Sequence, residues 1–311
     1  MARRRLLVTG GSGFLGSTVV LEAAKSKLWD IIAVSLSHDV HLEGVVSVRC
    51  DLSDPHEVRQ VIERHTPTAV INCAALASVD GCESERDLAT RLNADAPGAM
   101  AVACANVGAK LVHVSTDAVF GGTPPPYLTS SETSPLNWYG ETKLAGENAV
   151  LTANCAAAIV RTNIVGWSPL GTRSLLEFFS NRFDVGSDAP GFDDVEFRPA
   201  TTPQIARVLL NLAASPDAGI IHATGDQLIS KFEFGRLVAA TLGFEVDLVV
   251  RTSISDSGLT ARRADCLDVV PSRDIPAVRD NIDLERGMIE IRDLKNDGVR
   301  RRLQELVGVE I

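Results

Sequence analysis

Residues 5–16 read RLLVTGGSGFLG, and the turn that they encode predicts the architecture of the chain. A short apolar run enters Gly10, Gly13 and Gly16, and residues 14–27 continue with helical spacing. Glycines between a strand and a helix allow a tight turn and let the backbone approach a pyrophosphate, which the helix N-terminus attracts. Such turns also take glycine for steric reasons alone, so the motif gains meaning only within a series of strands and helices.

Four more apolar runs alternate with helical patterns in the first half of the chain. They are DIIAVSL (30–36), TAVINCAA (68–75), AKLVHVS (109–115) and AAAIVRT (156–162). Helices are predicted over 55–65, 85–108 and 139–154, with a kink or a split at Pro97. Apolar strands separated by helices are typical of a parallel sheet covered on both faces. The sequence therefore predicts a doubly wound, Rossmann-type α/β domain over residues 1–165.

The alternation weakens after residue 165. Residues 166–203 are rich in Gly, Pro and Asp, which favours a loop-rich region over a cleft. Two amphipathic helices, 204–215 and 231–243, flank a strand-like run at 219–225. We predict a smaller, interleaved substrate-side domain over 166–311, with segments from about 200–225 returning to the sheet and a closing helix in the tail.

Composition excludes several classes of function. The chain has 311 residues, 45% of them apolar, with a formal net charge of −10 and a pI near 5.1, which argues against a nucleic-acid partner. Six scattered cysteines without a C-x-x-C pair indicate reduced thiols, and no His/Cys/Asp cluster predicts a metal. No signal peptide or membrane span is expected. We expect a cytoplasmic protein, and the sequence leaves a homodimer open.

The end of the second strand bears on the dinucleotide. An acidic residue there would bind the free ribose hydroxyl of NAD, but Ser35 takes this position, with Ser37 and His38 close behind. Hydroxyls would accept a 2′-phosphate without repulsion, so NADP(H) is favoured over NAD(H), although the sequence indicates no arginine at this site. Asp51 and Leu52 could flank the adenine, or an Asp there could cap the next helix.

Small side chains after the third strand would let the backbone approach the cofactor, although a close-packed strand end accounts for them equally. The predicted cofactor-binding residues are Gly10, Gly13, Phe14, Leu15, Gly16, Ser35, Asp51, Leu52, Cys73, Ala74, Ala75, Tyr139 and Lys143.

Five motifs in order carry a family resemblance: TGGSGFLG, CDLSD, NCAA, STDAVFGG and SPLNWYGETKLAGE. Together they resemble the extended short-chain dehydrogenase/reductase superfamily, and their wording is most similar to the dTDP-4-dehydrorhamnose reductase family. The resemblance is close over residues 5–165 and loose in the C-terminal third. It implies an NAD(P)H-dependent reductase of a 4-keto-deoxysugar nucleotide.

The motif YGETK supports hydride chemistry from its own residues. Beside a lysine ammonium and an oxidised nicotinamide, the pKa of Tyr139 should fall from its ordinary value near 10. One helical turn separates Tyr139 from Lys143, which can also reach the nicotinamide ribose. In the reducing direction Tyr139 would donate a proton to the ketone oxygen, and Thr116 would hydrogen-bond that oxygen.

Substrate contacts are predicted for Thr116, Asp117, Asn163 and Arg198. Asp117 resembles the family's substrate-side Asp, and it could equally cap a turn. Arg198, like Arg161, is a candidate phosphate ligand because a guanidinium matches phosphate geometry, and an ion pair is an equal alternative.

Two departures from the family pattern bear on the substrate. Residues 161–167 read RTNIVGW, so Asn163 and Ile164 stand where the family continues RTS with Trp, and Gly121 replaces an acidic residue.

Two alternative functions stay open. One is an epimerase or dehydratase of the same superfamily, although no Glu follows Asp117. The other is a non-catalytic NADP-binding subunit resembling the regulatory partner of methionine adenosyltransferase.

Overall fold

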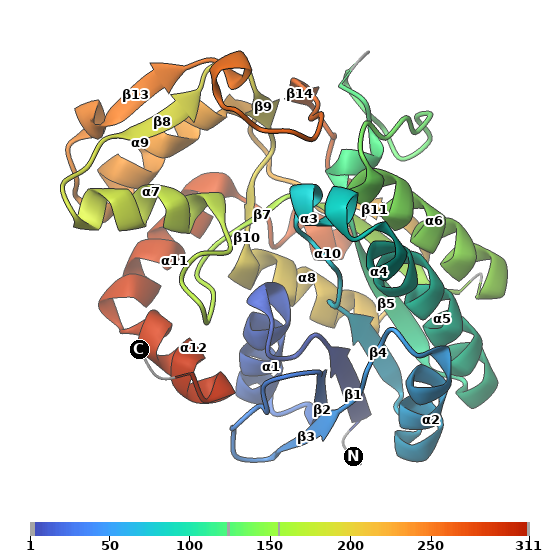
Figure 1. The fold of residues 1–311 in the computed structure, drawn as a ribbon. Helices are drawn as coiled ribbons and strands as arrows, with labels where there is room; N and C mark the ends of the chain where they lie inside the picture. The colour runs from blue at the N-terminus through green and yellow to red at the C-terminus, as the bar shows by residue number, and fades with distance from the viewer. Residues whose placement is uncertain (1–3, 123–124, 155, 310–311) are drawn as a thin grey trace.

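The computed structural model describes residues 4–122, 125–154 and 156–309 (Figure 1). Its centre is a seven-stranded sheet in the order β11-β6-β5-β4-β1-β2-β3, with every neighbouring pair parallel. The strands are β1 (Arg4–Thr9), β2 (Trp29–Ser35), β3 (Val45–Arg49), β4 (Ala69–Asn72), β5 (Lys110–Thr116), β6 (Ala158–Thr162) and β11 (Gly219–His222). The predicted doubly wound fold is confirmed. The order reverses between β1 and β4, where ligands bind in such sheets.

Helices cover both faces of this sheet. Within β1, Leu6 and Val8 enter one apolar layer with α1 and α8, whereas Leu7 enters the other with α2 and α5. The alternation explains why the strands are apolar at nearly every position. The helices of this half are α1 (Phe14–Ser26), α2 (Pro55–His65), α3 (Val79–Ser84), α4 (Arg86–Thr90), α5 (Ala96–Val107), α6 (Trp138–Ala153) and α8 (Thr202–Ala213).

Strand β3 and the helical region around Pro97 differ in detail from what the sequence predicts. Strand β3 was not predicted, and it forms the edge of the sheet beside β2. The region predicted as one helix with a kink or split at Pro97 changes from α4 to a π-helical turn at Arg91–Asp95 and then to α5, and its backbone stays helical into Pro97. The Ala96 N–H donates to the Arg91 carbonyl in the π-helical pattern, and such a local change of helix type is common beside a proline or another irregular position.

Three small sheets, β10-β7, β12-β9-β14 and β13-β8, lie beyond the carboxyl ends of the main strands. Their strands are β7 (Ile164–Val165), β8 (Ala189–Phe192), β9 (Glu196–Phe197), β10 (Ala200–Thr201), β12 (Ile229–Ser230), β13 (Val249–Thr252) and β14 (Cys266–Leu267). Their helices are α7 (Leu175–Asp184), α9 (Lys231–Leu242), α10 (Pro276–Arg279), α11 (Leu284–Asn296) and α12 (Val299–Val307).

The chain returns from this region to the main sheet through α8 beside α1 and β11 beside β6. The domain division at residue 165 stays a prediction. The tail forms two helices, α11 and α12, separated at Gly298, which has φ +71°.

No helix of the described chain is long and apolar enough to span a membrane. Within the same residues no group of three or more His, Cys, Asp and Glu is arranged to hold a metal ion. The described cysteines, Cys50, Cys73, Cys82, Cys104 and Cys266, are free, and Cys155 lies outside the described residues.

Candidate active site

The turn after β1 has room only for glycine at two positions. Gly10 has φ +65°, and a Cβ there would lie 3.0 Å from backbone atoms of Ala74. A Cβ on Gly16 would lie 2.0 Å from the carbonyl oxygen of Gly10. Helix α1 begins directly after Gly13, and no described side chain caps it. Its first N–H groups and the positive end of its dipole therefore suit the pyrophosphate of a dinucleotide.

The end of β2 lies against this glycine turn. Gly11 donates its backbone N–H to the Val34 carbonyl at 3.0 Å, and Ser35 follows as the last residue of β2. The Ser35 hydroxyl donates to the carbonyl of His38 at 2.6 Å. The expectation that no arginine stands at this site is wrong, because the unpredicted strand β3 makes Arg49 the register partner of Ser35.

Asp51 and Leu52 lie just beyond β3. The Asp51 carboxylate accepts the Ser53 N–H at 2.9 Å, whereas Asp54 caps α2 by accepting the His56 N–H at 2.7 Å. Leu52 is buried in the apolar layer shared with α2. Helix capping therefore belongs to Asp54, and a contact of Asp51 or Leu52 with adenine stays a prediction.

The segment after β4 meets the glycine turn from the other side. Asn72 holds it by accepting from the Thr9 hydroxyl at 2.5 Å and from the Ala74 N–H at 3.2 Å. Burial raises the pKa of the Cys73 thiol to about 12, so Cys73 is an unreactive neutral neighbour. The other predicted cofactor residues in these segments are Phe14, half-buried, Leu15, buried, and Ala75, half-buried.

Thr116, Tyr139 and Lys143 meet where β5 ends and α6 begins. Thr116 is the last residue of β5 and accepts the Ala118 N–H at 3.1 Å, and its side chain interacts with the phenol of Tyr139. Lys143, one turn along α6, is 2% exposed, and its Nζ donates to the Val114 carbonyl at 2.7 Å. The structure therefore brings the three predicted catalytic residues together.

The protein groups around Tyr139 favour its protonated form. Burial raises the pKa of Tyr139 to about 12, nearby Asp117 and Cys82 act in the same direction, and the interaction with Thr116 opposes them. The lowering expected beside an oxidised nicotinamide stays a prediction, because burial outweighs the other contributions of the protein. Burial also lowers the pKa of Lys143 to about 8, against the opposing charge of Glu147. At neutral pH Tyr139 keeps its proton, as a proton donor must.

Asp117 connects this site to the small sheets. Its carboxylate accepts from the Asn163 amide at 2.6 Å and from the Thr116 hydroxyl at 3.2 Å. Burial raises the pKa of Asp117 to about 6, and the charge of Lys231 acts in the opposite direction. Asn163 thus lies beside Asp117, and a contact of either side chain with the substrate stays a prediction.

The two candidate phosphate ligands both form ion pairs. Arg198 donates to the Asp268 carboxylate at 2.6 Å and to the Asp226 carbonyl at 2.9 Å, so its guanidinium is already engaged. Arg161 and Glu147 form a buried pair at 2.7 Å, with side chains only 2% and 1% exposed. Both arginines thus form the ion pairs that the sequence left open, and a contact of Arg198 with a substrate phosphate stays a prediction.

Gly121, where the family carries an acidic residue, has no room for one. A Cβ at this position would lie 2.7 Å from the carbonyl oxygen and the hydroxyl of Ser134. Packing of the chain between β5 and α6 therefore accounts for the missing carboxylate.

Residues that the sequence did not indicate complete the site. Lys231, the first residue of α9, interacts electrostatically with Asp117 and with Arg263. Arg263 donates to the Asp80 carboxylate of α3 at 2.9 Å, and Asn137 donates to the Arg262 carbonyl at 2.8 Å. These contacts fasten residues 260–263 onto the sheet half. In the sequence, only the predicted helix start at residue 231 could have pointed to Lys231 as a residue of the site.

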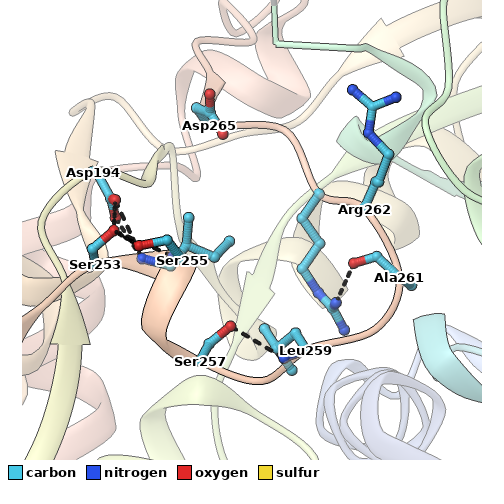
Figure 2. Close-up of a pocket in the computed structure, with 10 residues that line it drawn as sticks. Asp194, Ser253, Ser255, Ser257, Leu259, Ala261, Arg262 and Asp265 are labelled. Atoms are coloured by element: carbon cyan, nitrogen blue, oxygen red, sulfur yellow. Dashed lines mark hydrogen bonds between the residues drawn. The ribbon is translucent and has the colours of Figure 1, made fainter.

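A cavity of about 390 Å³ adjoins this loop (Figure 2). Ser253 and the Ile254 N–H bind the Asp194 carboxylate on one side, and Arg262 and Arg263 line the other. The cavity therefore presents hydroxyls, acids and guanidinium groups, a polar wall suited to a polar ligand.

Comparison with known proteins agrees with this geometry. The family model described as RmlD substrate binding domain matches residues 4–266. A relative named dTDP-4-dehydrorhamnose reductase, from Mycobacterium tuberculosis, is 38% identical over 253 residues, which cover 77% of this chain and 76% of the relative. A relative named methionine adenosyltransferase 2 subunit beta, from Xenopus laevis, is 34% identical over 244 residues, covering 76% and 71%.

Among solved structures, dTDP-4-dehydrorhamnose reductase from Bacillus anthracis in complex with NADP is similar, with a TM-score of 0.82. It is 26% identical, and the match covers 93% of this chain and 99% of that chain. This chain thus combines the glycine turn, the strand order and the cluster of Thr116, Tyr139 and Lys143 with similarity to these relatives. The chain belongs to the RmlD substrate-binding domain family and is an NAD(P)-dependent oxidoreductase of the extended short-chain dehydrogenase/reductase type.

Proposed function

We propose that this protein uses NADPH to reduce the ketone of a 4-keto-deoxysugar nucleotide. The observation that carries the proposal is the cluster at the carboxyl end of β5, where the side chain of Thr116 interacts with Tyr139 and Lys143 follows one helical turn later. The cluster lies at the end of the sheet that carries the glycine turn, at the edge where doubly wound folds bind their ligands.

The cofactor fits the residues present. The glycine turn is a cradle that a Cβ at Gly10 or Gly16 would fill, and α1 offers its uncapped N-terminus beside it. Gly10, Gly13 and Gly16 would hold the pyrophosphate, Ser35 would face the adenosine ribose, and Lys143 would bind the nicotinamide ribose. When bound, NADPH supplies the hydride.

The protein's own residues would then manage the proton and the developing charge. Tyr139, kept protonated by burial, donates its phenolic proton to the ketone oxygen, which becomes the alcohol. Thr116 hydrogen-bonds the same oxygen as charge develops on it. The ammonium of Lys143 stabilises the phenolate that Tyr139 becomes. Asp117 and Asn163 orient the sugar at the next position.

The test is NADPH oxidation by the purified chain mixed in turn with members of a panel of nucleotide 4-keto-sugars. We expect one member to consume one NADPH per sugar converted and to yield the alcohol. An epimerase or dehydratase would transform its sugar without net consumption of NADPH, and that result would overturn the proposal. A panel in which no sugar is reduced or bound would overturn it as well.

A further inference from the structure

An exposed ion pair lies at the adenosine end of the proposed cofactor site. Arg49 donates to the Asp39 carboxylate through Nε at 2.9 Å and through a second guanidinium nitrogen at 3.0 Å. The two side chains are 63% and 39% exposed. A guanidinium fork bound by both oxygens of a carboxylate is the geometry that also binds a phosphate monoester.

The strand register places this pair beside Ser35. Arg49 is the register partner of Ser35, and partners in adjacent parallel strands carry their side chains on the same face of the sheet. The same alternation puts Ala33 on that face, where the glycine turn packs: a Cβ on Gly11 would lie 3.0 Å from the Cβ of Ala33. Arg49 therefore shares the face of the sheet that carries the glycine turn and α1.

The loop that carries Asp39 is held on both sides. The His38 carbonyl accepts from the Ser35 hydroxyl at 2.6 Å, and the Val40 N–H donates to the Ser47 hydroxyl at 2.9 Å. Asp39 thus has a defined place opposite Arg49. The pKa of Asp39 is lowered by its hydrogen bonds with Arg49, so the carboxylate is charged at neutral pH.

We propose that Arg49 binds the 2′-phosphate of NADP(H), and that this phosphate replaces the Asp39 carboxylate on the guanidinium. The exchange breaks one charged pair and forms another, while Ser35 leaves the neighbouring position free of negative charge. Asp39 is then an internal competitor that weakens NADP(H) binding. This inference rests on the proposed function only for the identity of the bound cofactor.

The test is a set of dissociation constants for NADPH and NADH, measured on the full chain by the fluorescence of the reduced nicotinamide. We expect R49Q to weaken NADPH binding roughly tenfold or more, the range for a lost hydrogen bond to a charged group, and to leave NADH within about twofold. We expect D39N to tighten NADPH binding about threefold or more. Adenosine 2′,5′-bisphosphate, compared with AMP, should reproduce the R49Q effect without a nicotinamide.

A matched control is R251Q, because Arg251 forms a similar pair with Asp193 at 2.8 Å, with exposures of 63% and 34%, on β13. It should leave both dissociation constants unchanged. Equal weakening of NADPH and NADH by R49Q, or no weakening of either, would overturn the inference. Weaker NADH binding in D39N would also overturn it, by making Asp39 a ribose ligand. Because no sugar is involved, failure of the proposed reductase reaction would show separately in the sugar panel.

Discussion

An ion pair inside the sheet half and an ion pair of the small sheets differ in their burial. In the sheet half, Arg161 and Glu147 form a pair that is almost fully buried, and Ser115 donates to the same carboxylate. In the other region, Arg251 and Asp193 form an ion pair that is largely exposed. The predicted catalytic residues thus stand beside an ion pair that burial fixes, since Glu147 acts on the charge of Lys143, whereas the pair of the small sheets is exposed to solvent.

The largest test of this difference is the stability cost of removing an arginine from each pair. Arg161→Met should lower the free energy of unfolding by about 3–5 kcal/mol, because Glu147 would be left as an unpaired buried charge. Arg251→Met should cost about 1 kcal/mol or less, as exposed pairs do. Urea unfolding of both variants measures the two values, and similar costs would refute the contrast.

A second test uses Asp117, where the two regions meet. Its pKa is raised from 3.8 to about 6, so the folded protein holds this proton more tightly than the unfolded chain does. Ionisation of Asp117 should therefore reduce stability as the pH rises from about 4 to about 6, by about 3 kcal/mol in total. Asp117→Asn cannot ionise, and its stability relative to wild type should rise over this window and level off above it.

Urea midpoints of both proteins at about pH 4.5, 5.5 and 7 check this prediction, since they span the window between the two pKa values. A difference between Asp117→Asn and wild type that stays constant with pH would contradict it. Asn163→Ala serves as the matched variant, because it removes a hydrogen bond to Asp117 and leaves the carboxyl able to titrate.

The third test concerns the predicted cofactor site at the end of β2. Ser35→Asp should shift the preference from NADPH towards NADH, because the carboxylate would repel the 2′-phosphate and accept the ribose hydroxyls. We expect the ratio of the two dissociation constants to change roughly tenfold, the value of one charged hydrogen bond. Fluorescence titration measures it, and tighter NADH binding by the unaltered chain would remove the basis of this prediction.

The smallest expected effect concerns the ion pair of Arg263 with Asp80, which holds the loop at residues 260–263. Arg263→Gln removes the ion pair with Asp80, which is partly exposed, and should raise KM for the nucleotide sugar about two- to fivefold. The dissociation constant for NADPH should not change, because the loop contacts α3 and not the glycine turn. Asp80→Asn should give the same result. A loss of NADPH affinity in either variant would show that the loop also supports the cofactor site.

The sequence predicted the long elements, whose apolar periodicity repeats several times, and it missed the short strands. Helix α2 was predicted with its observed bounds, because an Asp and a Pro mark its start and an apolar stripe runs along it. Strand β3 was missed because Val45–Arg49 lacks a continuous apolar run and no helix separates it from β2. The two-residue strands of the small sheets carry no periodicity at all, so only the folded chain reveals them.

The residues of the candidate site likewise fall into those that local motifs indicated and those that only the folded chain brings together. Thr116, Tyr139 and Lys143 lie in motifs whose spacing is local, and the structure brings them together as the sequence indicated. The pair of Arg263 with Asp80 joins residues 183 positions apart, and Arg49 reached Ser35 only through the missed strand. Such contacts depend on long-range packing, which no local pattern encodes.

The turnover of Tyr139→Phe with the sugar identified in the panel decides whether this cluster performs the proposed chemistry. We predict that kcat for NADPH oxidation falls roughly 10²-fold or more, the scale of a lost general acid, while the dissociation constant for NADPH stays within about twofold. Cofactor binding would survive without the proton donor. A Tyr139→Phe protein that reduces the sugar at the wild-type rate would contradict the assignment of Tyr139 and with it the proposed reaction.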